Sequence, residues 1–411
     1  MTHSLVNRCD QILWISFCLL IVLLPFSSGA VQFFSYFIFF VFLAQIALER
    51  PKIRFHPGLM DWAIMAWLIF SVISIVVNPY PENGWKGLFF KVLPRVGLFY
   101  IFIRVMRSED RIRWFLISAI AGIFVLCLAG LSQYIFGEDF IRHRPLMDGR
   151  VQSTMKAPTD MAAYLMTFAP LVLMLAWKTR ELHAFTIRVV SERNLRLFFL
   201  FVFVVLVFCL GLTYSRGGWL AFVLGMTGMA ILEKRLRIPV VLLMIAFWMY
   251  FPHKMVTERA HMDATLVMDS FGRKTFWTES WHLIQAKGLF GGGLNAYVDA
   301  VVPFKINWGE YPHNCYLQMW AEIGIFGLLS FLWIHATIFY NAVAVVLKSN
   351  HEACRRLLPA LLLGYAGFLF HSGFDTFFYS ASLGTFLWIL MALAVALTRM
   401  ACCNIKEASP R

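Results

Sequence analysis

The stretch PHNCYLQMWAEIGIFG, residues 312–327, passes from polar to apolar residues within a few positions. His313 and Asn314 stand where an apolar helix is predicted to begin. A histidine at such an edge can be neutral near pH 7 and can accept a proton. We therefore take His313 as a candidate catalytic base, with Asn314 and Tyr316 as candidate substrate contacts. The alternative is a polar helix cap, and Glu322, further along the helix, would need a partner as a buried carboxylate.

A second candidate motif is Tyr214-Ser215-Arg216-Gly217-Gly218-Trp219, which joins two apolar runs. An arginine between two membrane helices is costly unless it meets an anion, and its planar fork suits a phosphate or carboxylate. We expect Arg216 to be catalytic and Ser215 to contact substrate. The alternative is a tight turn from which Arg216 extends to water.

A third motif, FGRKTFW at residues 271–277, leads into a predicted amphipathic helix. Trp277, Trp281 and Ile284 share one face at helical spacing, and that face would lie on a membrane surface. Arg273 near the helix start would point at an anion held by the helix N-terminus, so it is a third catalytic candidate. The alternative is an interfacial helix with ordinary basic flanks. The following run Gly288–Asn295 could form an anion-binding nest or a simple turn.

Further cations lie on or near the same outer side. Lys91 and Arg95 share a face of one apolar run because they are four residues apart. Glu322 or Asp375 could pair with them structurally, and a substrate phosphate could pair with them functionally. Segment 137–158 adds three more predicted substrate-binding residues, which are Arg142, Arg144 and Arg150. Together the cations suit an anionic lipid headgroup such as a diphosphate. No acidic metal-binding pair stands out, so neither a metal nor another cofactor is expected.

The composition specifies what must position these side chains. The chain has 411 residues, of which 60% are hydrophobic and 14% charged, with 41 Phe and 14 Trp. A soluble protein is nearer half apolar and a quarter charged. Lipid offers no partner for backbone polar groups, and the apolar runs do not alternate, so the spans must be helices. The sequence therefore predicts an all-α polytopic membrane protein.

About twelve spans are predicted. The apolar runs lie near residues 12–29, 31–48, 60–78, 87–103, 114–136, 160–177, 197–214, 218–232, 238–251, 315–347, 357–372 and 381–398. Most of the 36 Lys and Arg fall in alternate connections and at both termini, which are therefore predicted to be cytoplasmic. The first two runs are interpreted as a hairpin of two spans rather than a cleaved signal peptide.

This topology divides the chain into three parts. Residues 1–251 would hold spans one to nine, 252–313 an outer loop with the amphipathic helix, and 314–411 the last three spans with a cytoplasmic tail. Loops as long as the outer one usually carry function. The net charge of +13 follows mostly from the excess of Lys and Arg in the predicted cytoplasmic connections, so no nucleic-acid partner is expected. The eight cysteines show no zinc or disulfide spacing, and no phosphate-binding glycine fingerprint occurs.

In the order of its motifs the chain resembles the O-antigen ligase/polymerase superfamily. The motifs are Ser215-Arg216-Gly217-Gly218, a long outer loop with Arg273 and Gly288–Asn295, His313-Asn314-x-Tyr316-Leu317, and Glu322-x-Gly324-x-x-Gly327-Leu328. They span roughly residues 205–330. One position departs from the pattern, since Asp160 stands where an asparagine is expected.

The resemblance implies a bacterial inner-membrane enzyme with a periplasmic active site. It implies an undecaprenyl-diphosphate-linked glycan donor and, for a ligase, a sugar hydroxyl of lipid A–core as acceptor. By position His313 would act on the acceptor hydroxyl, and Arg216 and Arg273 would hold the diphosphate. Metal and nucleotide sugar would play no part.

Two other functions remain open on the sequence. An O-antigen polymerase would use the same donor but a second lipid-linked repeat unit as acceptor. A transporter of an anionic lipid or solute would use Lys91, Arg95 and Glu322 as a charge relay. Transporters usually show two similar halves, and this chain shows no internal repeat.

Overall fold

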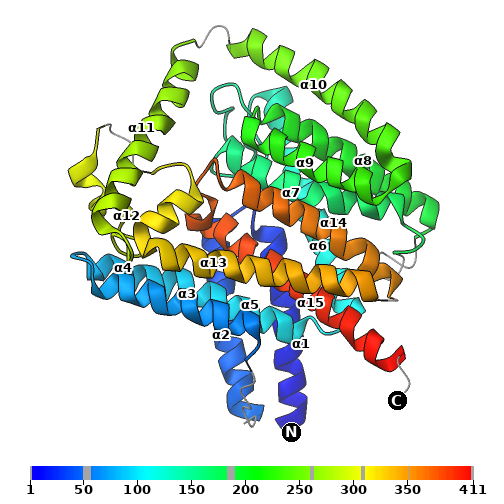
Figure 1. Cartoon of the computed structure of the whole chain (residues 1–411). Coiled ribbons are helices and arrows are strands. Elements are labelled where there is room, and N and C mark those ends of the chain that lie inside the picture. Colours follow the sequence, from blue (N-terminus) through cyan, green and yellow to red (C-terminus); the bar gives the residue numbers. More distant parts are fainter. Residues whose placement is uncertain are drawn as a thin grey trace.

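The computed structural model describes residues 2–49, 57–182, 190–259, 263–306, 311–349 and 351–408, and within these ranges the regular elements are helices (Figure 1). The first eight are α1 (Thr2–Leu23), α2 (Ser28–Glu49), α3 (Leu59–Val76), α4 (Pro81–Gly87), α5 (Leu93–Val105), α6 (Glu109–Phe136), α7 (Pro158–Trp177) and α8 (Glu192–Leu212). The others are α9 (Arg216–Leu232), α10 (Arg237–Arg259), α11 (Asp263–Lys287), α12 (Tyr297–Ala300), α13 (Cys315–Lys348), α14 (Glu352–His371) and α15 (Ala381–Ala408).

Each of the twelve predicted apolar runs coincides with a helix of its own, and this confirms the all-α class. Among the described residues, eight helices are long and apolar enough to cross a membrane. They are α1, α2, α3, α6, α7, α8, α13 and α15. The total number of spans, their orientation and the three-part division stay predictions.

Helix α7 lies at the centre of the fold. It packs against α8, α9 and α14, and almost every residue from Pro158 to Ala176 is buried. Outer helices instead expose large apolar side chains such as Phe33, Phe40 and Leu347. An apolar periphery of this extent suits lipid rather than water. Helix α13 runs beside α3, and α15 runs beside α5 (Figure 1).

Between α4 and α5 the chain forms one π-helical turn, Leu88–Val92, in which the N–H of Leu93 donates to the carbonyl of Leu88. Pro94 follows directly and has no N–H to give to the preceding turn. The backbone hydrogen-bond pattern of the helix therefore changes from α-helical to π-helical over this turn. Lys91 lies inside the turn and Arg95 just beyond it.

Helix α13 is broken at Gly324, which has φ 74° and ψ 178°. The break leaves carbonyl groups without helical donors, and the glycine run after α11 supplies them. The N–H groups of Gly292 and Gly293 donate to the carbonyls of Ala321 and Glu322 at 2.7 and 2.8 Å. A Cβ at Gly324 would stand 1.9 Å from the carbonyl oxygen of Leu289. The glycine run is therefore a turn packed on α13. Its Gly292 and Gly293 N–H groups bind carbonyls of α13, so these two groups are not free to form an anion-binding nest.

Helix α11 differs from the prediction in one respect. Arg273 was expected near the start of this helix, but α11 begins at Asp263, so Arg273 lies in its middle. The expected role of the helix N-terminus at Arg273 is therefore wrong, because residues 263–272 continue the helix instead of forming a loop. Ile284, with Leu283, is buried against α12 and α13, whereas Trp277 and Trp281 remain 40% and 45% exposed.

We expect Gly324→Ala to destabilise the protein by about 3 kcal/mol or more, because it adds a positive-φ penalty to a backbone clash. The matched control is Gly149→Ala, where φ is +68° and a Cβ would meet nothing within 4 Å. It should cost only about 1 kcal/mol. Thermal unfolding of both purified variants measures the difference, and equal shifts would contradict the packing argument.

Candidate functional site

His313, just before α13, pairs with Asp375, just after α14. Its Nδ1 lies 3.2 Å from Oδ1 of Asp375, and the two side chains are 44% and 14% exposed. Asn314 fixes the start of α13, since its Oδ1 accepts from the N–H groups of Tyr316 and Leu317, each at 3.0 Å. Asn314 is therefore the cap of α13, whereas the His313 side chain faces the carboxylate of Asp375.

Asp375 is held as an anion. Burial alone would raise its pKa, but the hydrogen bond and charge of His313, with bonds from Thr159 and from the Thr376 N–H, lower the pKa to about 2. The Thr376 N–H donates to Oδ1 at 2.8 Å. A carboxylate on Nδ1 orients the imidazole and leaves Nε2 as the nitrogen for proton transfer. Asp375 is a functional candidate that the sequence had suggested only as a partner of Lys91 or Arg95.

The start of α9 forms the second part of the site. Ser215 caps this helix, because its Oγ accepts from the N–H of Gly218 at 3.3 Å. Arg216 is the first helical residue and is exposed. A helix N-terminus offers unpaired N–H groups and a partial positive charge. With the Arg216 guanidinium beside it, this end can hold an anion.

His371 joins these two parts. Its Nε2 lies 3.5 Å from Oγ of Ser215, and its ring packs on Phe377. A Cβ on Gly217 would stand 2.8 Å from the ring, so only glycine permits this approach. The next residue, Ser372, accepts the N–H of Cys315 at 2.9 Å. Sequence reasoning missed His371, and the signal was the polar run HSGFDT, residues 371–376, between two apolar runs.

Arg273 reaches the site from α11. Phe276, three residues later on the same face, has its ring centroid 6.3 Å from that of His313. The Trp277 indole N–H donates to the carbonyl of Pro312 at 2.9 Å, which ties α11 to the residue before His313. Arg273 is close enough for its charge to act on His371. The residues on either side of Arg216 contact His371, and the charge of Arg273 acts on the same His371, which lies four residues before Asp375. The catalytic roles of His313, Arg216 and Arg273 stay predictions.

Four of the predicted substrate contacts donate to backbone carbonyls, and one of them is Arg144, whose guanidinium donates to Met155 at 2.8 Å. Arg95 donates to Phe378 and Ser380, each at 2.7 Å, and not to Glu322 or Asp375. Arg150 Nε donates to Thr213 at 2.8 Å, and the Tyr316 hydroxyl donates to Leu369 at 2.7 Å. These side chains brace the loops around the site.

Lys91 occupies a different position from Arg95. Its ammonium donates to Oδ1 of Asn295 at 2.6 Å and lies near the carboxylate of Glu322. Glu322 also accepts from the Gln318 amide and the Asn295 N–H, each at 3.0 Å. Its carboxylate therefore joins α13, the glycine turn and Lys91. Arg142 and Arg144 line a separate cavity at the turn between α1 and α2.

The described part of the chain holds no cluster of three His, Cys, Asp or Glu side chains suited to a metal ion. The chemistry that the residues themselves offer is general base catalysis at His313 and stabilisation of an anion at Arg216 and Arg273. Independence from metal stays a prediction.

Comparison with known proteins finds similarity to O-antigen ligases. The model of the family described as O-antigen ligase matches residues 201–332, a range that contains Arg216, Arg273 and His313. The O-antigen ligase of Salmonella typhimurium strain LT2 is 24% identical over 381 residues, which cover 87% of this chain and 89% of that protein. Together with the all-helical membrane architecture, these matches support the assignment of the chain to the O-antigen ligase superfamily.

Proposed function

We propose that this protein is an O-antigen ligase of the bacterial inner membrane. It transfers a polysaccharide from undecaprenyl diphosphate to a sugar hydroxyl of lipid A–core on the periplasmic face. The observation that carries the proposal is the His313–Asp375 pair, in which Asp375 follows His371, whose ring contacts the Ser215 cap of the helix that begins at Arg216. Such a transfer needs a base for a hydroxyl and cations for a leaving diphosphate, and this site offers both.

In this mechanism the acceptor hydroxyl gives its proton to Nε2 of His313 while its oxygen attacks the anomeric carbon of the donor. The bond between that carbon and the diphosphate oxygen breaks, and the diphosphate leaves with the electron pair. A new glycosidic bond replaces it. Asp375 stabilises the imidazolium that forms, and Arg216 and Arg273 neutralise the charge that develops on the diphosphate.

The other predicted site residues also have roles in the proposal. Arg95, Arg150 and Tyr316 contribute by fixing the loops that they brace, and Ser215 and Asn314 by capping the helices that carry Arg216 and His313. Lys91, Arg142 and Arg144, which line cavities, are the cations proposed to bind substrate. No metal or cofactor takes part in any step.

His313→Ala should lower the rate of glycan transfer by about 10²–10⁴, the range contributed by a positioned base. Asp375→Asn should lower it by about 10², because the amide keeps the shape but loses the charge that supports an imidazolium. Since the pKa of Asp375 is about 2, its ionisation should not change the rate between pH 5 and 8.

The assay is transfer of labelled glycan in membranes that contain equal amounts of each variant. His282→Ala is the matched control, since this histidine is exposed on α11 and should leave the rate unchanged. Normal product from membrane-inserted His313→Ala would exclude His313 as the base.

Arg216→Gln and Arg273→Gln should each lower kcat by about ten-fold to a hundred-fold, because a hydrogen bond to a charged group contributes about 1.5–3 kcal/mol. Lys274→Gln removes the same charge from the residue next to Arg273 and should change kcat less than two-fold. Steady-state kinetics with purified donor and acceptor measure these effects. Equal losses for Lys274→Gln and Arg273→Gln would point to general electrostatics instead of a specific contact.

Deletion of the gene in its own host separates the proposed ligase from a polymerase. The ligase predicts loss of the whole lipopolysaccharide ladder on a gel, with polymer accumulating on the lipid carrier. A lipid A–core bearing a single repeat unit would instead show a polymerase. An unchanged ladder would refute both. Restoration of the ladder by the wild-type gene, and not by His313→Ala, completes the test.

A further inference from the structure

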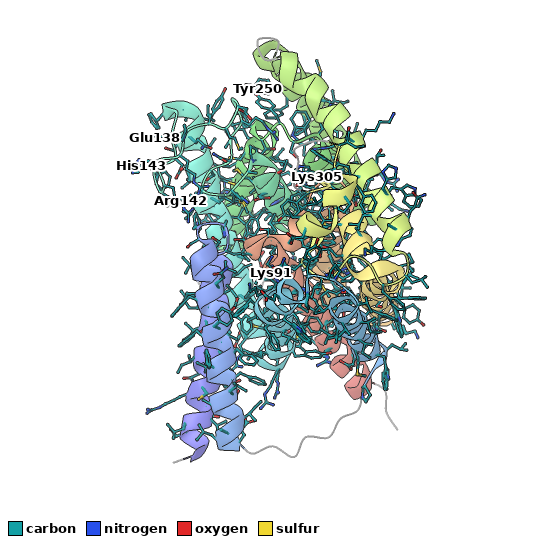
Figure 2. The ribbon with its side chains drawn as sticks, turned by 90° about the vertical axis from the view of Figure 1, so that its left-hand side faces the viewer. Lys91, Glu138, Arg142, His143, Tyr250 and Lys305 are labelled. Carbon is teal, nitrogen blue, oxygen red and sulfur yellow. The ribbon has the colours of Figure 1, made fainter. Side chains whose placement is uncertain are left out.

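A basic cavity lies at the turn of the α1–α2 hairpin, and we call it the hairpin cavity. It has a volume of about 450 Å³ and is lined by the turn between α1 and α2, by residues of segment 137–157, and by the start of α15. Its cations are Arg142, Arg144 and Lys156, and Asp160 is its one carboxylate among the described lining residues. Figure 2 shows Arg142 above the ends of α1 and α2 and Lys91 further into the molecule.

The loop that carries these cations is held in one shape by buried side chains. Oδ1 and Oδ2 of Asp139, which is fully buried, accept the N–H groups of Ile141, Arg142 and Arg144 at 2.6–3.0 Å. Gln133, also fully buried, donates to the carbonyls of Arg144 and Pro145. Fully buried, hydrogen-bonded polar groups of this kind specify a unique conformation.

The loop is also attached to the hairpin. The Thr154 hydroxyl donates to the carbonyl of Pro25 at 2.9 Å, so the loop and the α1–α2 turn form one wall. On that wall Arg144 uses one guanidinium nitrogen to bind the carbonyl of Met155 at 2.8 Å. Arg142 and Lys156 are exposed, and within the described residues their side chains make no hydrogen bond. The cavity therefore presents a pre-organised surplus of positive charge.

An inner cavity of about 200 Å³ adjoins the hairpin cavity. The two share Lys156, Asp160, Tyr379 and Ser380, and the inner one also reaches Tyr311 and Thr376. Tyr311 lies two residues before His313, and Thr376 directly follows Asp375. No described residue of α9 or α11 lines either cavity. Arg216 on α9 and Arg273 on α11 therefore lie outside the lining of both cavities.

We propose that the hairpin cavity binds a phosphate group on the head of the acceptor glycolipid, while Arg216 and Arg273 hold the diphosphate of the donor. The inference rests on the proposed function and adds a subsite to it. Two lipid-anchored substrates must meet at one base, and a cationic site on each side of the base keeps them from competing for one position. Arg142 and Lys156 are the positioning residues for the acceptor.

The test compares the wild type with the double variant Arg142→Gln/Lys156→Gln in steady-state transfer with two acceptors. One is phosphorylated lipid A–core, and the other is the same lipid after removal of its phosphates. For the phosphorylated acceptor the double variant should raise KM at least about ten-fold, the loss expected for a charge-assisted contact, with KM for the donor unchanged. For the dephosphorylated acceptor, wild type and variant should show the same raised KM.

Lys305→Gln is the control, because Lys305 is exposed in the outer segment and lines neither cavity. A raised KM for the donor in the double variant would overturn the assignment, as would an equal effect on both acceptors. Competition by phosphatidylglycerol vesicles with no dependence on acceptor phosphate would assign the cavity to bulk phospholipid and also overturn it.

A wild-type protein that transfers nothing to lipid A–core would refute the proposed function without deciding the cavity. Binding of phosphorylated lipid A–core to the purified protein, measured by native mass spectrometry, then decides it. Binding that is weakened about ten-fold in the double variant supports the cavity as a phosphate subsite. Equal binding by both proteins rejects it.

Discussion

The backbone carbonyls of Ala321 and Glu322 have no helical donors, because α13 is broken at Gly324. In a membrane such groups must be satisfied inside the protein. The N–H groups of Gly292 and Gly293 satisfy them, and this joins the end of α11 to α13. The same pair of helices carries Arg273 and His313, so the distance between a proposed diphosphate ligand and the proposed base depends on that junction. The side chain of Glu322 strengthens this junction, because its carboxylate accepts the N–H of Asn295.

Sequence reasoning identified the helices and the principal polar residues, because both are local properties. Length and hydropathy define a membrane helix without knowledge of its neighbours. An arginine or histidine beside an apolar run is equally visible. It was therefore possible to single out Arg216, Arg273 and His313 before any arrangement in space was known.

Partners and orientations could not be derived in the same way. His371 ends α14 and Asp375 follows it, more than fifty residues after His313. Only the packing of α14 on α9 and α13 brings them to the site. The motif FGRKTFW, residues 271–277, was expected to lead into a helix, whereas residues 263–272 already belong to α11. Arg95 was expected to pair with a carboxylate or with a substrate phosphate, but it donates to two carbonyls in the turn before α15. Tertiary context decides such choices.

The π-helical turn at Leu88–Val92 is equivalent to one residue inserted into an otherwise regular helix. It rotates the chain before it relative to the chain after it, so Lys91 and Arg95 serve different neighbours despite a spacing that would align them in an α-helix. Loss of one residue there would restore regular pitch and turn the whole of α4 about its axis. The segment can thus change which side chains face the cavities through a change in length alone, with every residue type kept. Insertions and deletions, and not only substitutions, are therefore a route by which relatives of this protein could alter the substrate that they accept.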